Sequence, residues 1–102
     1  MRLVVMFDLP TETKKNKKDY TEFRRFLIRD GYDMIQFSVY SRICRDGESA
    51  RQHVVKLRQW APQVGAIRAL LITNKQFAEA MIISGERKIQ EKKINEAQLL
   101  LF

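Results

Sequence analysis

The chain contains few of the residues on which special folds depend. Its 102 residues include one cysteine, two prolines and four glycines. The single cysteine, Cys44, excludes an intrachain disulfide, and no Cys/His spacing indicates a zinc site. The low Gly and Pro content excludes collagen-like and linker-like classes. No apolar run approaches the roughly 20 residues of a membrane span. The amino terminus lacks a basic region followed by a long apolar stretch, so we expect a soluble, cytoplasmic protein without a membrane partner.

The sequence is rich in hydrophobic residues and carries an excess of positive charge. Hydrophobic residues make up 45% of the chain and aromatic residues 10%, which supports one modest core and excludes global disorder. Nineteen Lys and Arg residues against twelve Asp and Glu residues give a net charge of +7. A small domain this basic favours polyanionic partners, because phosphates release counterions when cations bind them. The alternative is a soluble protein that simply carries excess lysine.

The first half of the chain predicts a strand, a helix and two further strands. Residues 2–8 form an apolar strand that ends before Pro10, since proline cannot supply a ladder hydrogen bond. A helix follows, with Asn16 as its N-cap, acidic residues in its first turn and Gly31 as its stop. Residues 33–44 are long for a single strand, so we expect two.

The second half predicts a helix, a strand and a short tail of further elements. Ser49 and Gln52 match a capping box, which opens a second helix that Pro62 closes. His53 lies within the apolar pattern of this helix, which favours a packing role over a catalytic one. The remaining predictions are a strand at 67–72, a short helical turn at 76–80 and a strand at 81–84.

This order of elements predicts an α+β sandwich. Two helices on one face of an antiparallel sheet give the ferredoxin-like βαββαβ arrangement as the simplest topology. We assign residues 1–85 to this domain and residues 86–102 to a carboxyl-terminal extension. Four consecutive apolar residues at 99–102 would be a sticky patch in a monomer, so we expect a further strand that contacts a second protomer or another partner. The alternative is a tail that folds back on its own sheet.

Asp8 is the most informative single residue. It is an acid at the end of an apolar strand, where a carboxylate can leave the core and enter a cleft. One carboxylate is a poor magnesium site, but two copies of Asp8 in a homodimer could share one Mg²⁺ ion, which would polarise a phosphodiester. The alternative from local sequence is that Asp8 caps the Pro-containing turn that follows it.

The basic residues form two groups that could grip backbone phosphates without reading bases. The first group is at the entrance to the first helix: Lys14, Lys15, Lys17 and Lys18. The second follows the strands at 33–44: Arg42 and Arg45. For both groups the alternative is an ordinary solvated face. The aromatic residues do not favour a base-stacking surface, because Tyr20, Phe23 and Phe26 have core-like helical spacing.

Several of these stretches resemble a known family. The opening residues 3–10, Leu-Val-Val-Met-Phe-Asp-Leu-Pro, are similar to the first strand of the small CRISPR-associated Cas2 proteins. Gly31-Tyr32, the Gln-Phe-Ser-Val-Tyr stretch at 36–40 and the Lys-Gln-Phe at 75–77 continue the likeness. Together with the stretch Ile-Ile-Ser-Gly at 82–85, the Lys-Gln-Phe at 75–77 is most similar to members found beside type II effectors. The resemblance covers essentially the whole chain.

The resemblance implies a ferredoxin-like homodimer in prokaryotic adaptive immunity. Such a dimer bridges two dimers of the CRISPR integrase, and the assembly captures short double-stranded DNA as new spacers. Family members are also described as metal-dependent endonucleases of RNA or DNA, with the strand-end aspartate, here Asp8, as the catalytic residue and magnesium ligand. The leading hypothesis is therefore a DNA-binding structural subunit, and the alternative is a magnesium-dependent nuclease acting through paired Asp8.

Overall fold

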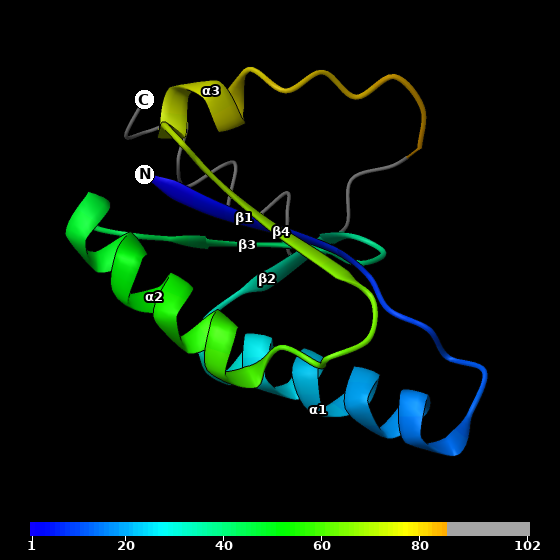
Figure 1. Cartoon of the computed structure of the whole chain (residues 1–102). Coiled ribbons are helices and arrows are strands. Elements are labelled where there is room, and N and C mark those ends of the chain that lie inside the picture. The colour runs from blue at the N-terminus through cyan, green and yellow to red at the C-terminus, as the bar shows by residue number, and fades with distance from the viewer. Residues whose placement is uncertain (86–102) are drawn as a thin grey trace.

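The computed structural model describes residues 1–85, which form an α+β sandwich (Figure 1). One sheet has the strand order β2-β3-β1-β4, with neighbouring strands antiparallel. The strands are β1 (Arg2–Asp8), β2 (Asp33–Gln36), β3 (Val39–Ile43) and β4 (Ala66–Ile72). The helices are α1 (Lys14–Arg29), α2 (Gly47–Trp60) and the short α3 (Asn74–Ala78). This order confirms the predicted ferredoxin-like arrangement.

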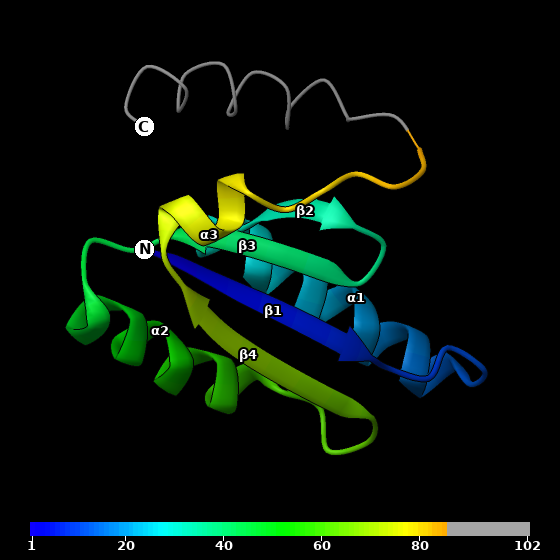
Figure 2. The ribbon, with the colours of Figure 1, turned by 90° about the horizontal axis from the view of Figure 1, so that it is seen from above.

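The two faces of the sheet differ in what covers them. Both long helices lie on one face, and α3 lies on the other, across the end of the sheet where β1 begins (Figures 1 and 2). We call this second face the open face. Side chains alternate along β1, so Leu3, Val5 and Phe7 are buried under the helices while Met6 and Asp8 are exposed on the open face. The register places Ala66 and Arg68 of β4 opposite Asp8 and Met6.

The core joins the helix face of β1 to α1. Phe23 and Leu27 are fully buried, and the Phe7 and Phe23 rings meet edge to face with centroids 5.3 Å apart. Tyr40 of β3 is also buried and stacks on Phe7 at 5.7 Å. Removing a buried phenyl group of this kind costs about 3–5 kcal/mol. The predicted core role of the aromatic residues of α1 is confirmed for Phe23 and Phe26, whereas Tyr20 is half-buried.

Both predicted helix starts were wrong by one turn. Thr13 caps α1, because its Oγ1 accepts a 3.0 Å hydrogen bond from the backbone N–H of Asn16. Asp46 caps α2 in the same way, with its Oδ1 accepting from the N–H of Ser49 at 2.8 Å. Asn16 and Ser49 therefore supply the third backbone N–H of each helix rather than the cap. The first turn of α1 contains no acidic residue, contrary to expectation.

The remaining elements follow the predictions with two differences. The segment 33–44 does form two strands, and the short carboxyl-terminal helix, α3, begins at Asn74 because Thr73 caps it in a capping box with Gln76. The predicted strand at 81–84 is wrong, since these residues have no strand pairing. The predicted extension at 86–102 and its strand lie outside the described residues. Within residues 1–85 no helix is long and apolar enough to cross a bilayer.

Candidate nucleic-acid interface and the Asp8 edge

Asp8 lies at the very end of β1, exposed on the open face. The chain between α2 and β4 packs closely against this strand end at Gly65, which has a φ of +104°. A Cβ at this position would lie 2.7 Å from the Asp8 carbonyl oxygen and 2.7 Å from a methyl of Leu9. Only glycine fits both the backbone conformation and the space. The absence of a side chain at Gly65 therefore allows the loop before β4 to pack directly against the backbone of Asp8.

The Asp8 carboxylate forms no hydrogen bond or ion pair within residues 1–85. The alternative prediction, a cap on the following turn, is thus not what the structure has. Within the same residues, no three Asp, Glu, His or Cys side chains come together in a way that could hold a metal ion. Mg²⁺ takes carboxylate oxygens and keeps several waters. The Asp8 carboxylate is one such oxygen donor, and a homodimer would supply a second copy of it.

The lysine group lies on the first two turns of α1 rather than on its approach. Lys14, Lys15 and Lys17 are exposed and form no ion pair in the part of the chain that the structure describes. Lys18 lies 4.0 Å from Glu22, in an exposed pair of little energetic value. The positive end of the helix dipole adds to the field of these lysines. The result is a cationic helix start at the same end of the sheet as Asp8 (Figure 1).

The two arginines of the second group lie in different surroundings. Arg45 is exposed, and its Nε lies 3.4 Å from the Asp46 carboxylate. The side chain of Arg42 is only 21% exposed, and its Nη1 donates to the carbonyl oxygen of Asp30. Arg42 is thus held in an internal network, which leaves little of its guanidinium for a phosphate. The register pairs Arg42 with Leu3 near the start of β1, and Arg45 lies between β3 and α2. Both residues are therefore at the opposite end of the sheet from the lysines.

His53 belongs to the same network as Arg42. Its Nδ1 lies 2.7 Å from the Asp30 carboxylate, and Lys56 Nζ lies 3.3 Å from the other carboxylate oxygen. The predicted packing role of His53 therefore misses its main interaction, which is polar. No sequence pattern indicates this interaction, because Asp30 follows α1 and is 23 residues away from His53.

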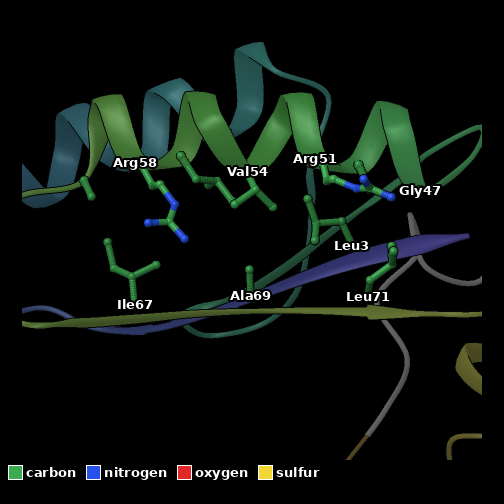
Figure 3. Close-up of a pocket in the computed structure, with 11 residues that line it drawn as sticks. Leu3, Gly47, Arg51, Val54, Arg58, Ile67, Ala69 and Leu71 are labelled. Carbon is green, nitrogen blue, oxygen red and sulfur yellow. The ribbon is translucent and has the colours of Figure 1, made fainter.

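A groove of about 570 Å³ separates α2 from β4 (Figure 3). Its floor includes Ile67, Ala69 and Leu71 of β4, which α2 covers only in part. Arg58 extends from α2 toward the strand, and Arg51 lies at the other end of the groove (Figure 3). Neither guanidinium has an ion pair within residues 1–85. The groove was not predicted, because the apolar spacing of α2 is that of a helix that packs fully on its sheet.

Two further residues stand out that the sequence analysis did not single out. Phe37, in the turn between β2 and β3, is 79% exposed and stacks on Tyr20 with ring centroids 6.4 Å apart. Arg2 is buried on the open face, where its guanidinium lies 4.3 Å from the centre of the Phe77 ring and donates to Ser41 Oγ at 3.3 Å. Burial lowers the pKa of Arg2, and the nearby Asp33 acts in the opposite direction.

Comparison with known proteins gives these features a context. The family model described as CRISPR associated protein Cas2 matches residues 1–80. The chain belongs to the Cas2 family. A protein of Acidovorax ebreus is 49% identical over 102 residues, which is the full length of both chains. A protein of Campylobacter jejuni is 44% identical over the whole of this chain and 71% of its own length. Both are named CRISPR-associated endoribonuclease Cas2.

A solved Cas2 structure supports the fold independently. The crystal structure of Streptococcus pyogenes Cas2 at pH 6.5 superposes with a TM-score of 0.61 and covers 80% of this chain and 99% of that one. At 21% sequence identity, this likeness speaks for the fold alone. The Cas2 family is known to be dimeric and acts in CRISPR adaptation. The resemblance read from the sequence is thereby confirmed.

Proposed function

We propose that this Cas2 chain is the structural DNA-binding subunit of the CRISPR adaptation complex, in which its homodimer bridges integrase dimers and holds duplex protospacer DNA. The observation that carries the proposal is the start of α1, where Lys14, Lys15 and Lys17 are exposed without a carboxylate partner within residues 1–85. Lysines on a rigid helix fix a duplex by its phosphates and carry no base preference. Arg45 would add a phosphate contact at the other end of the sheet.

The open face supports the homodimer. Ile43 and Leu70 are each 52% exposed there, on the strands that flank β1. Apolar side chains gathered on one sheet face favour a covering surface. A second copy placed on this face would also bring the two Asp8 residues into the same interface. The contribution of the extension at 86–102 to that interface remains a prediction.

A second function rests on a specific observation at Asp8. Its exposed carboxylate has no partner within residues 1–85, and the relatives are named endoribonucleases. Two such carboxylates across a dimer would hold one Mg²⁺ ion, which would polarise a phosphodiester in RNA or DNA. Each chain contributes a single acid to this site. The structural role therefore has the stronger support.

Salt dependence of DNA binding tests the structural role directly. Each phosphate neutralised contributes about −0.9 to the slope of log K against log salt. Replacing Lys14, Lys15 and Lys17 by Gln should therefore make the slope shallower by up to about 2.7 units, equally for duplexes of unrelated sequence. Lys75→Gln, on α3 and on the other side of the sheet, is the matched control and should leave the slope unchanged. An unchanged slope in the triple variant would exclude the α1 interface.

Spacer acquisition separates the two functions. The wild type and Asp8→Ala are compared with the cognate integrase at equal dimer content. We expect acquisition to survive in Asp8→Ala, because the phosphate contacts lie on α1. A loss of acquisition while the dimer and its complex persist would favour a required ion or chemistry at Asp8. The nuclease hypothesis further requires cleavage by the protein alone that a chelator abolishes.

A further inference from the structure

Phe37 is an aromatic ring held in an exposed position. It lies in the turn between β2 and β3, and 79% of its surface is accessible. The next residue, Ser38, has a φ of +63°, and its carbonyl oxygen accepts a 3.1 Å hydrogen bond from the backbone N–H of Phe7. This bond ties the turn to the end of β1. The ring is therefore presented by a fixed turn.

The ring is also supported from below. Phe37 stacks on Tyr20 with an interplanar angle of 25°, and Tyr20 in turn meets Phe7 edge to face at 6.0 Å. Phe7 is buried under α1. The three rings thus form a column that starts in the core and ends in solvent. Because Tyr20 belongs to α1, the column lies on the helix side of the sheet and not on the open face.

The surroundings of the column are cationic. Lys17 precedes Tyr20 by three residues and Arg24 follows it by four, so both share its face of α1. Lys17 has no ion pair within residues 1–85, and Arg24 donates from Nε to the Tyr40 hydroxyl at 2.9 Å. Lys14 continues the stripe one turn earlier. Lys17 and Arg24 thus lie on either side of Tyr20 along α1, and Phe37 stacks on Tyr20. An exposed ring beside cations on a rigid scaffold matches a base with phosphates on either side.

We propose that Phe37 stacks an unpaired nucleobase while Lys17 and Arg24 hold the flanking phosphates. The proposal rests on the proposed DNA-binding function and adds to it a preference for nucleic acid with unpaired nucleotides. Stacking needs a free base face, which a fully paired duplex offers only at its ends. A second copy of the chain is the competing occupant, but the open face proposed for the dimer is on the other side of the sheet.

Three DNA probes with the same fluorophore test the proposal by anisotropy: a blunt duplex, the same duplex with thymidine overhangs, and the same duplex with abasic overhangs. The two overhang probes have equal charge and differ only in their bases. We expect the wild type to bind the thymidine probe at least about fivefold more tightly than the abasic one. Phe37→Ala should remove this preference without changing blunt-duplex affinity, and Phe37→Trp should keep it. Val55→Ala, an exposed apolar position on α2, is the control and should keep the preference.

The outcomes distinguish this inference from the proposed function. If the blunt duplex is not bound, the DNA-binding function itself fails. If it is bound but the two overhang probes bind equally, or if Phe37→Ala keeps the preference, the stacking site is wrong. Sedimentation velocity on the same variants measures whether they remain dimeric. If Phe37→Ala weakens the dimer and lowers all three affinities equally, Phe37 is a protomer contact and the inference is overturned.

Discussion

His53 on α2 and Asp30 at the end of α1 are joined by a 2.7 Å contact between imidazole Nδ1 and carboxylate Oδ2. A carboxylate only accepts hydrogen bonds, so Nδ1 carries the proton of this bond. Arg42 of β3 and Lys56 of α2 approach the same carboxyl group at 3.9 and 3.3 Å. Asp30 is 11% exposed, and it is the carboxylate shared by these three basic side chains. It thereby links both helices to the sheet.

Asp30→Ala should destabilise the protein by about 2–4 kcal/mol. The substitution leaves three basic groups close together without their counter-charge, and His53 and Arg42 are mostly buried. Urea unfolding followed by circular dichroism measures the effect. Glu22→Ala is the control, since it removes only an exposed 4.0 Å pair and should cost under about 1 kcal/mol. Equal losses in both variants would contradict a structural role for the network.

The burial of Tyr32 predicts that the protein loses stability at alkaline pH. Burial raises the pKa of its phenol above the ordinary value, and the charge of Asp30 acts in the same direction. A raised pKa means that stability is fully present below the unfolded value of about 10 and is lost as the pH rises above it. The hydroxyl has no hydrogen-bond partner within residues 1–85. Tyr32→Phe should therefore add about 1 kcal/mol at pH 7 and a larger margin above pH 10. Thermal melts of both proteins from pH 7 to above pH 10 measure this difference. If the advantage of Tyr32→Phe over the wild type shrinks as the pH rises, the prediction is wrong.

Gly85 is a control for the close packing of Gly65 against the backbone of Asp8. Both have positive φ angles, +104° and +98°, but a Cβ at Gly85 meets no atom of residues 1–85 within 4 Å. Gly85→Ala should cost only the backbone strain, about 1–2 kcal/mol. Gly65→Ala adds a clash with the backbone of Asp8, so it should cost about 3 kcal/mol or more. Denaturant titration compares the two, and equal costs would mean that the loop moves away without strain.

The helix caps give a fourth prediction. Thr13→Ala removes the hydroxyl that caps α1 and should cost about 1 kcal/mol, or roughly 4–8 °C in the melting temperature. Thr13→Ser should retain most of the stability. Asn16→Ala should have a smaller effect, because the cap uses the backbone N–H of Asn16 and not its side chain. If calorimetry shows a larger loss of stability for Asn16→Ala than for Thr13→Ala, Asn16 is the cap instead.

The same cap shows where sequence-based prediction loses accuracy. Thr13 and Asn16 are both good capping residues, and they are three positions apart, so local preference alone does not choose between them. In the structure Thr13 is the cap, so α1 begins at Lys14 and includes the lysines. The apolar run at 2–8, the paired strands at 33–44 and the family resemblance were correct, because each rests on many residues that agree.

The sequence by itself determined the class of fold, the family, the net charge and the position of Asp8 at a strand end. The net charge follows from composition alone, and the other three depend on the order of residues along the chain. Only the tertiary structure decided that Arg42 and His53 share Asp30, that Gly65 packs on the backbone of Asp8 and that Phe37 stacks on Tyr20 in solvent. These contacts join residues 12 to 57 positions apart. Hydrophobic periodicity records which face of an element is buried, but not which side chains of other elements meet it.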